Sequence, residues 1–597
     1  MAFRRTTLKD PAADAPTSKA APPSSPASSA ALPMPAERLG ELLVRKDRLT
    51  PTQLNEALLQ QSASGKRIGQ LLVELGALDE RDLAWALSEQ FDIEHVDLGH
   101  QTPDPEAVAL LSETVARSES AIPLRIEQDG RLTVVVSDVT PEMLGRLESA
   151  AGRAVTLAVA PDADVKRAID TSYKALAGVD QHLRAFEAAT AETLRRAGGQ
   201  TTVDDGISDD APVVQVVNLI ITQGLRDRAS DIHIEPQDDR VRVRFRIDGA
   251  LHDILALPAD IGPALVSRIK IMAGMNIVER RRPQDGQIAT TVDARALDIR
   301  VSTTATIRGE KVVMRLLDKS KPLFRSVDLG MPEDTRELYS SMVQSPYGMV
   351  VCAGPTGSGK TTTLYATMAE INSAERNITT IEDPVEYVFP GINQIQINEQ
   401  AGLTFADGLR SILRQDPDVI LVGEIRDVET ARIAVQSALT GHFVLSSIHA
   451  TDSVLALHRF LDMGIESFLI ASSVRAVVGQ RLLRRTCTSC KEEYSPSDDE
   501  RTFYEELTEG QGEKKHWFRG TGCNFCANTG YRDRIGIYEL LRVTPELKRL
   551  VVGWATQDEL RRMAVSQGMR TLKDEAMALV EHDITTVDEV VKTIYAA

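Results

Sequence analysis

Cysteine, positive charge and long apolar runs are all scarce in this chain of 597 residues. Its five cysteines are too few for a disulfide-stapled scaffold and are typical of a reducing compartment. No apolar run approaches the roughly 18 residues of a membrane-spanning helix, and no signal peptide follows Met1, so we expect a cytoplasmic protein. Lys and Arg number 68 against 86 Asp and Glu, giving a net charge of −18. That balance argues against nucleic acid as the main partner.

The length of the chain and its average composition predict several folded domains. A chain of 597 residues exceeds what one hydrophobic core supports. Its hydrophobic share of 42% and charged share of 26% are close to those of soluble globular proteins. Two segments depart from that average. Residues 1–35, rich in Ala, Pro and Ser, are expected to be a disordered leader, and residues 176–210 are expected to be a linker.

A tandem repeat follows the leader. The segment RLGELLVRKDRLTPTQLNEALLQQ starts at Arg38, and RIGQLLVELGALDERDLAWALSEQ starts at Arg67, so the constant offset is 67 − 38 = 29 residues. Each copy predicts a short helix, a turn and a second helix, which begins after an N-cap at Thr50 or at Asp79. Beyond the repeats, residues up to about 173 alternate short strand-like and helical patterns, which indicates a small α/β lobe.

The most specific motif of the chain is a phosphate-binding loop. The segment from Gly354 to Thr361 satisfies G-x-x-x-x-G-K-[ST], between an apolar strand and a helical pattern. Its backbone N–H groups are expected to cradle phosphate oxygens, Lys360 to neutralise them, and the Thr361 hydroxyl to bind magnesium. The alternative is a Gly-rich strand-to-helix turn without a ligand. The predicted nucleotide-binding residues are Gly354, Pro355, Thr356, Gly357, Ser358, Gly359, Lys360, Thr361 and Thr362.

Polar side chains follow three further predicted strands, as a parallel α/β sheet with its ligand at the carboxyl edge requires. Glu382 and Asp383 follow the first strand, Glu424 the second and His449 the third. Glu424 is predicted to polarise the attacking water or to hold the magnesium shell, and Glu382 to share that work. The alternatives are an acidic cap on the next helix and a structural histidine.

Four segments in this order resemble the motifs of the type II secretion and type IV pilus assembly ATPases, which are hexameric RecA-like motors. They are GPTGSGKTT from Gly354, TIEDPVEY from Thr380, ILVGEIRD from Ile420 and TGHFVLSSIHATD from Thr440. The segments ASDIHIEP and ERRRPQDGQ resemble signatures of the preceding domain in that family. The resemblance implies that Glu424 activates water, that Glu382 assists near magnesium and that His449 senses the γ-phosphate. The usual family segment LHTND reads IHATD here, without the Asn.

The same resemblance gives a role to arginines of a sheet-rich segment that precedes the loop. Arginine suits bidentate contact with phosphate oxygens. In the family, arginines of this domain reach a nucleotide across a domain or subunit boundary. The candidates are Arg244, Arg246, Arg268 and Arg281, of which Arg246 and Arg268 are the predicted catalytic pair. The alternative is the solvated face of an alternating strand, which is our interpretation of Arg242.

Four of the five cysteines form two CxxC pairs. They are Cys487 with Cys490 and Cys523 with Cys526, separated by 523 − 490 − 1 = 32 residues. Two such pairs are a signature of a structural, tetrahedral zinc site, and redox chemistry is the alternative. A similar insertion in the assembly ATPases, which retraction members typically lack, favours an extension or secretion motor. Cys352 lies in the apolar strand before the phosphate loop and is interpreted as core packing.

The tandem repeat resembles a cyclic di-GMP-binding N-terminal domain of some of these ATPases. The resemblance implies contacts from the start and the closing Gln of each copy. Asp47 stands where the second copy has the turn glycine Gly76, which adds an anion near an anionic ligand. The alternative is a helical docking platform for an assembly partner. The implied ligand residues are Arg38, Leu39, Gly40, Gln61, Arg67, Ile68, Gly69 and Gln90.

The sequence therefore predicts a multidomain α/β protein that acts as a magnesium-dependent ATPase. The predicted parts are a repeat lobe over 36–175, a sheet-rich domain over 211–320, a RecA-like core over 321–480, a zinc insertion over 481–535 and a helical subdomain over 536–597. The expected function is a homohexameric motor that assembles type IV pili or a type II secretion pseudopilus. The alternatives are a cyclic di-GMP-responsive regulatory ATPase and a DNA-uptake or DNA-transfer motor.

The implied cofactors are ATP, Mg²⁺ and Zn²⁺, with cyclic di-GMP as a further ligand. The implied partners are an inner-membrane platform protein and a cytoplasmic docking protein of the machine. Contact with the cytoplasmic face of the inner membrane is expected only through these partners, and no nucleic acid is expected.

Overall fold

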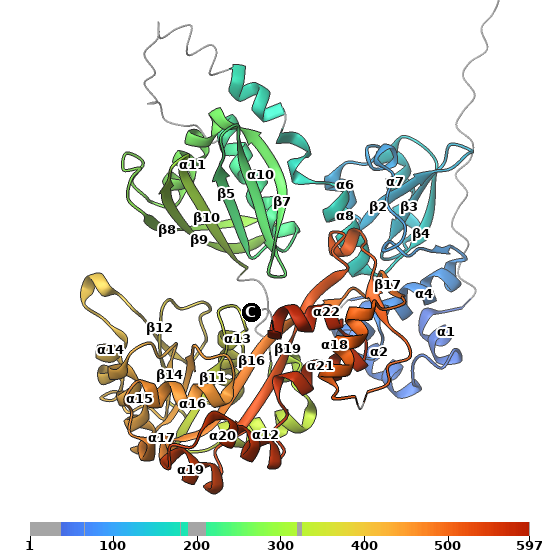
Figure 1. Ribbon diagram of the computed structural model, residues 1–597. Helices are drawn as coiled ribbons and strands as arrows, with labels where there is room; N and C mark the ends of the chain where they lie inside the picture. The colour runs from blue at the N-terminus through green and yellow to red at the C-terminus, as the bar shows by residue number, and fades with distance from the viewer. Residues whose placement is uncertain are drawn as a thin grey trace, which may run out of the picture. The chain divides into compact units, whose positions relative to one another are not determined.

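The computed structural model describes residues 37–64, 66–179, 181–188, 211–318, 325–510 and 512–595. The predicted leader over 1–35 and most of the predicted linker, residues 189–210, lie outside these ranges. Among the described residues, one compact unit holds 37–96 and 109–162, and a second holds 97–108 and 163 onwards (Figure 1). No helix in the described part of the chain is long and apolar enough to cross a membrane.

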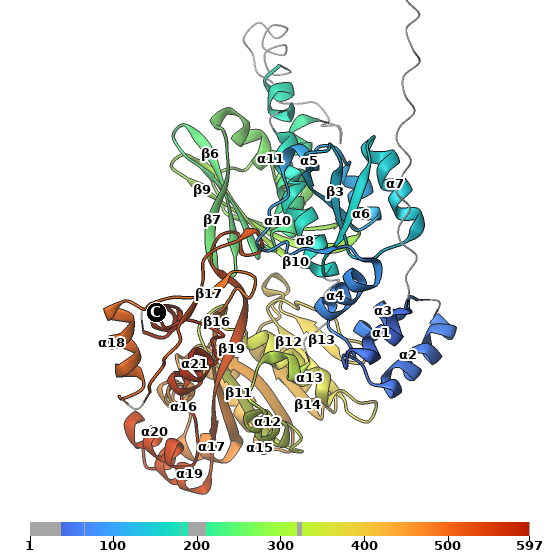
Figure 2. The same ribbon diagram turned by 90° about the vertical axis from the view of Figure 1, so that its right-hand side faces the viewer.

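The first unit begins with the four helices of the tandem repeat, which Figure 2 shows as one blue cluster. They are α1 (Leu39–Arg45), α2 (Pro51–Ser64), α3 (Ile68–Glu74) and α4 (Glu80–Phe91). Asp79 caps α4, as predicted, because its side chain accepts a hydrogen bond from the Arg81 amide. The turn residues Asp47 and Gly76 both have a left-handed backbone, with φ of 54° and 68°.

The two copies of the repeat share an ion pair of opposite polarity. In the first copy Arg45 Nη2 lies 2.8 Å from Glu37 Oε2, and in the second Lys66 Nζ lies 2.7 Å from Glu74 Oε1. The offset of 29 carries Glu37 onto Lys66 and Arg45 onto Glu74. The two copies therefore keep the contact and reverse its signs.

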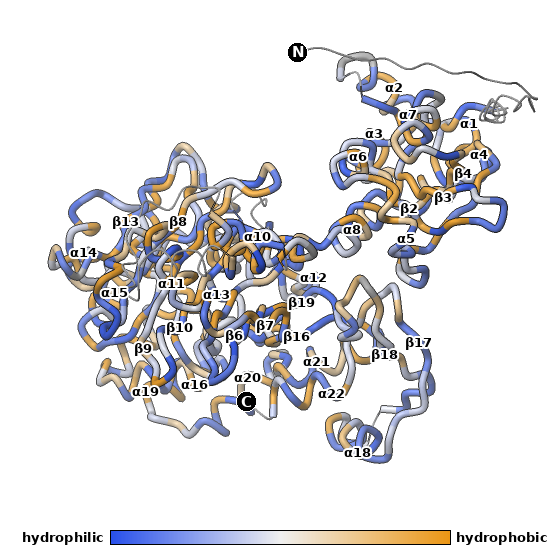
Figure 3. Tube along the Cα trace, turned by 90° about the horizontal axis from the view of Figure 1, so that it is seen from above, coloured by the Kyte–Doolittle hydropathy of each residue, from blue (hydrophilic) through white to orange (hydrophobic). Residues whose placement is uncertain are grey.

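A four-stranded sheet completes the first unit, in the order β1-β4-β3-β2. Its strands are β1 (Glu94–His95), β2 (Ala121–Ile126), β3 (Leu132–Val136) and β4 (Val155–Val159). All five residues of β3 are buried, and Figure 3 shows this strand as largely apolar. The helices α6 (Glu113–Ser118) and α7 (Pro141–Ala151) accompany the sheet.

The second unit contains a six-stranded antiparallel sheet in the order β7-β6-β5-β10-β9-β8. Alternation places Ile232, Val243 and Phe245 in a buried cluster with the helices α10 (Pro212–Arg226) and α11 (Gly262–Met272). On β6 the alternate positions are arginines, as the segment RVRVRFRI shows. The strands are β5 (Asp231–Pro236), β6 (Arg240–Ile247), β7 (Ala250–Pro258), β8 (Gln284–Val292), β9 (Arg295–Thr306) and β10 (Gly309–Asp318).

A seven-stranded sheet in the order β13-β12-β14-β15-β11-β16-β19 forms the centre of the second unit. The first six strands are parallel, and β19 runs antiparallel to β16. They are β11 (Gly348–Ala353), β12 (Ile378–Glu382), β13 (Asn393–Gln396), β14 (Val419–Val422), β15 (Phe443–Ile448), β16 (Val474–Thr486) and β19 (Tyr531–Arg542).

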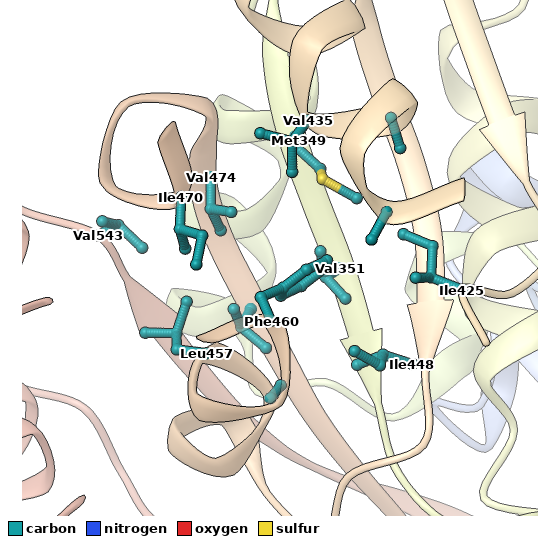
Figure 4. Packing of buried hydrophobic residues seen from close by; sticks show 14 of the residues in the cluster. Met349, Val351, Ile425, Val435, Ile448, Leu457, Phe460, Ile470, Val474 and Val543 are labelled. Atoms are coloured by element: carbon teal, nitrogen blue, oxygen red, sulfur yellow. The ribbon is translucent and has the colours of Figure 1, made fainter. Parts of the chain in front are cut away.

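Alternate residues of β11 enter two cores on opposite faces of this sheet. Met349 and Val351 belong to a cluster with Phe460 and Val474, shown in Figure 4. Val350 and Cys352 belong to a second cluster on the other face. Burial raises the pKa of the Cys352 thiol to about 12, which keeps it protonated.

Helices cover both faces of the sheet. The first face carries α14 (Phe405–Ile412), α15 (Val428–Leu439), α16 (Ser453–Asp462), α17 (Ser467–Ser473), α19 (Pro545–Val552) and α20 (Gln557–Ser566). The second face carries α12 (Glu333–Val343) and α13 (Lys360–Ile371).

The cysteine segment connects β16 to β19. It contains the short strands β17 (Lys491–Glu493) and β18 (Phe518–Gly520) and the helix α18 (Asp498–Leu507). The predicted boundary at residue 536 lies within β19, and the helices α19 to α22 begin only at Pro545. They end with α21 (Leu572–Glu581) and α22 (Val587–Val590).

Candidate nucleotide site and cysteine cluster

The phosphate loop joins the buried strand β11 to the first turn of α13. Gly357 and Gly359 have φ of 79° and 90°, a backbone region that favours glycine. A Cβ on Gly354 would lie 2.4 Å from Oγ of Ser358, and a Cβ on Gly359 would lie 2.8 Å from Nε2 of Gln480. At Gly354 and Gly359 the loop therefore has no room for a side chain. It ends at the N-terminus of α13, a position that favours binding of an anion.

Lys360 is the first residue of α13, and its ammonium group lies inside the loop. Its Nζ donates hydrogen bonds to the carbonyl oxygens of Gly354 at 2.8 Å and Pro355 at 3.0 Å. Burial lowers the pKa of Lys360, and the charge of Glu424 opposes that shift. A poorly hydrated ammonium beside a helix N-terminus is well placed to bind phosphate oxygens.

Glu424 and His449 meet at the carboxyl edge of the sheet. Glu424 follows β14 and His449 follows the neighbouring strand β15, and His449 Nε2 lies 3.1 Å from Glu424 Oε2. Arg426 forms an ion pair with the other oxygen of Glu424 and lies 3.8 Å from Asp383. The side chain of Glu424 is 16% exposed and that of His449 is 50% exposed. The structure therefore brings together Glu424, His449 and Asp383. It adds Arg426, which was not predicted from the sequence.

Glu382 lies at the end of β12 and is only 3% exposed. One of its oxygens accepts a hydrogen bond from the Tyr365 hydroxyl. The other accepts from Thr380 Oγ1 at 2.6 Å and Gln394 Nε2 at 3.2 Å. Tyr365 comes from α13, the helix that follows the phosphate loop. Glu382 is thus bound by the same helix that carries Lys360. The spacing of these residues in the sequence does not predict that contact.

The arginines of the six-stranded sheet are largely engaged by its own acidic residues. Arg242 and Arg244 each donate to Glu235 at 2.9 Å. Arg246 Nη1 donates to the Gly249 carbonyl at 2.7 Å, and its Nε lies 3.8 Å from Asp231. Arg268 lies on α11 and is half-buried, whereas the side chain of Arg281 is 92% exposed.

The four paired cysteines form one buried cluster whose sulfur atoms lie within 4.8 Å of one another. Three sulfur–sulfur distances are 3.8, 3.8 and 3.7 Å. A tetrahedron with Zn–S bonds of about 2.3 Å has edges of about 3.8 Å, so the cluster fits zinc. The amides of Gly522 and Gly530 donate to cysteine sulfurs at 3.3 Å, as expected around thiolates.

The glycine at the start of each copy lies against the second helix of the same copy. A Cβ on Gly40 would lie 2.6 Å from Leu54, and a Cβ on Gly69 would lie 2.7 Å from Leu83, so each glycine permits close helix packing. Leu39 and Ile68 pack against the same apolar cluster.

The closing glutamine of each copy donates a hydrogen bond to the other copy. Gln61 Nε2 donates to the Lys66 carbonyl at 3.2 Å, and Gln90 Nε2 donates to the Glu37 carbonyl at 2.9 Å. Glu37 and Lys66 are equivalent positions, so each glutamine bonds the residue before the arginine of the other copy. Arg67 forms an ion pair with Asp138, whereas Arg38 is exposed.

Comparison with known sequences gives two matching families. The family described as "Type II/IV secretion system protein" matches residues 207–592, and the MshEN domain matches residues 91–178. The MshEN match begins directly after Gln90, the last residue of the second repeat.

Individual proteins match over nearly the whole chain. The "Type IV pilus assembly ATPase PilB" of Myxococcus xanthus is 38% identical over 558 residues, which cover 93% of this chain and 98% of that protein. The "Type II secretion system protein E" of Xanthomonas campestris is 39% identical over 566 residues, with the same two coverages. A solved structure described as "Structure of MshE with cdg" is 30% identical, covering 23% of this chain and 99% of that chain, at a TM-score of 0.22.

Proposed function

Because this chain belongs to the type II/IV secretion system protein family, we propose that it hydrolyses ATP to drive assembly of type IV pili or of a type II secretion pseudopilus. One observation carries the proposal. The glycine loop with Lys360 lies at the same sheet edge as the Glu424–His449 pair. Phosphate binding and water activation are thereby brought to one place.

The residues of this edge divide the work. The loop amides and Lys360 bind the phosphates, and the Thr361 hydroxyl holds magnesium, which when bound supplies charge neutralisation at the phosphate oxygens. Glu424 is oriented by Arg426 and His449, so its carboxylate can accept a proton from the attacking water. Glu382 is proposed to assist near magnesium, and its hydrogen bond from the Tyr365 hydroxyl fixes the position of its carboxylate. His449 reports whether the γ-phosphate is present.

The experiment is phosphate release by the full chain with Mg-ATP. Lys360→Ala is expected to abolish nucleotide binding and turnover. Glu424→Gln keeps the shape of the side chain and is expected to lower kcat by about 10²-fold or more, with nucleotide binding retained. The matched control is Glu429→Gln on α15, an exposed side chain paired with Arg410. If Lys360→Ala lost ATPase activity but still supported assembly in cells, hydrolysis would serve regulation and the motor proposal would be wrong.

The motor is proposed to be a homohexamer at the cytoplasmic face of the inner membrane. An inner-membrane platform protein and a cytoplasmic docking protein are its proposed partners. Native mass spectrometry with a nucleotide analogue tests the hexamer. Stimulation of hydrolysis by DNA would instead favour a DNA-transfer motor.

We also propose that the repeats bind cyclic di-GMP. The two copies present Arg38 and Arg67 at equivalent positions, and the MshEN match follows directly after them. Calorimetry on the full chain is expected to detect binding at micromolar protein, and Arg38→Ala to weaken it by about tenfold. Arg45→Ala, on the exposed side-chain pair with Glu37, is the control. Absence of binding by the folded chain would identify the repeats as a docking platform.

A further inference from the structure

Two acidic side chains bind the segment from His449 to Leu455, one from within the segment and one from β19. Asp452 is the N-cap of α16, and its side chain is 17% exposed. Glu539 lies in β19 and is 1% exposed. Only two residues separate Asp452 from His449. Whatever fixes Asp452 therefore also limits where His449 can lie.

Backbone amides of the segment depend on these two carboxylates. The Ser453 amide donates to Glu539 Oε1 at 3.0 Å, and the Ser453 hydroxyl donates to the same oxygen. The Leu455 amide donates to Asp452 Oδ1 at 2.9 Å. A Cβ on Gly479 of β16 would lie 2.9 Å from the Ser453 nitrogen. The segment thus packs directly against β16 and β19 of the sheet.

One guanidinium bridges both acids. Arg561 of α20 places Nη2 2.9 Å from Asp452 Oδ2 and Nη1 3.5 Å from Glu539 Oε2. Water barely reaches Glu539, and this burial raises the pKa of its carboxyl group. Neighbouring carboxylates repel each other where one is buried and the other half-buried, and a shared cation relieves that repulsion.

We propose that Arg561 is a positioning residue of the nucleotide site: by bridging Asp452 and Glu539 it holds the segment that carries His449 beside Glu424. The C-terminal helix α20 thereby acts on the sheet edge where phosphate is bound. This inference rests on the proposed ATP hydrolysis for its effect on turnover, but the placement of the segment can be measured without nucleotide.

The test uses Arg561→Met and Arg561→Lys in the full chain. Hydrogen exchange without nucleotide is expected to be about tenfold or more faster at the Ser453 and Leu455 amides of Arg561→Met, because their acceptors lose their shared cation. Its kcat is expected to fall about tenfold while KM stays within about twofold, as for a group that acts on the transition state through others. Arg561→Lys keeps the charge but cannot bridge both acids, so smaller changes in the same direction are expected.

Arg562→Met is the matched control. Arg562 is the next residue on α20, is exposed, and donates to the Asp558 carbonyl of its own helix. Parental exchange at both amides in Arg561→Met and Arg561→Lys would overturn the inference, and so would faster exchange with parental kcat. If Arg561→Met does not fold, Arg561→Lys decides by the same two measurements. If the parental chain does not hydrolyse ATP, the proposed function fails, and the exchange rates still decide whether Arg561 holds the segment.

Discussion

At the scale of single residues, Gly357 and Gly359 share a left-handed backbone but differ in their surroundings. A Cβ on Gly357 would meet nothing within 4 Å, whereas one on Gly359 would strike Gln480 Nε2 at 2.8 Å. Gly357→Ala is therefore expected to lower the free energy of unfolding by roughly 1–2 kcal/mol, the cost of a left-handed backbone for a residue with a Cβ. Gly359→Ala is expected to weaken binding of a fluorescent ATP analogue at least tenfold more than Gly357→Ala. Equal affinities of the two variants would contradict this account of the loop.

Glu235 gives a second prediction, which concerns pH. Burial alone would raise the pKa of Glu235, but hydrogen bonds from Arg244, Lys311 and Arg242 outweigh it and lower the pKa to about 2. A lowered folded-state pKa contributes stability above the unfolded value of about 4.5, and that stability is lost as pH falls toward 2. Glu235→Gln is thus expected to lower the free energy of unfolding more at pH 7 than at pH 3. Denaturant titrations at both pH values measure this. An equal loss at both would be the contrary result.

The residues that the sequence selected best were those with a motif around them. Lys360 and Glu424 follow recognisable strands, and the parallel order of those strands brings them together. Tyr365 was missed because its contact depends on how a helix packs on the sheet. Arg426 lies only two positions after Glu424, within the segment ILVGEIRD, so the motif could have indicated it. The Glu382–Tyr365 hydrogen bond joins residues 17 positions apart through strand and helix packing, which no local pattern encodes.

At the scale of elements, the buried parallel strands were predictable and the long edge strand β19 was not. β11, β12, β14 and β15 are the strands predicted before Gly354 and before the polar residues of the sheet edge, and all of their residues are buried. β19 begins with charged residues and ends with apolar ones, so its start does not resemble a strand. Its pairing with β16 stabilises it as a strand, although its own sequence does not predict one.

The cysteine segment carries a prediction of its own. β16 and β19 lead into the segment and out of it, so loss of the metal is expected to loosen this hairpin. Cys490→Ser is expected to reduce bound zinc, measured by mass spectrometry, from one ion per chain to well below that, and to lower Tm by about 5 °C or more. Cys352→Ala is the control because Cys352 lies in a hydrophobic core. A full zinc content in Cys490→Ser would refute the assignment of the four ligands.

At the scale of the whole molecule, a family motif can name a residue whose target lies on another copy of the chain. The guanidinium of Arg246 has partners within its own sheet, Gly249 and Asp231. A role in another subunit would require it to exchange those partners for phosphate oxygens. Such an exchange depends on assembly, which one chain does not encode as a local pattern.

Mixed hexamers test that role. Chains with Arg246→Ala and Arg268→Ala but intact Lys360 are combined with chains carrying Lys360→Ala but intact arginines. If the arginines act across a subunit boundary, the mixture is expected to hydrolyse ATP severalfold faster than either variant alone. Arg240→Ala, an exposed arginine at the start of β6, is the control variant. Parental turnover by the assembled double variant would remove the assignment.

The reversed ion pairs of the repeats bear on how the two copies diverged. Glu37 with Arg45 and Lys66 with Glu74 make one contact in two polarities, so both positions of the pair differ in sign between the copies. Any path between the two states that changes one residue at a time passes through like charges or an unpaired group. Both pairs are exposed, where such a pair contributes only about 0.2–1 kcal/mol. A change at either position of such a surface pair therefore costs little stability, and the two copies tolerate different charge patterns.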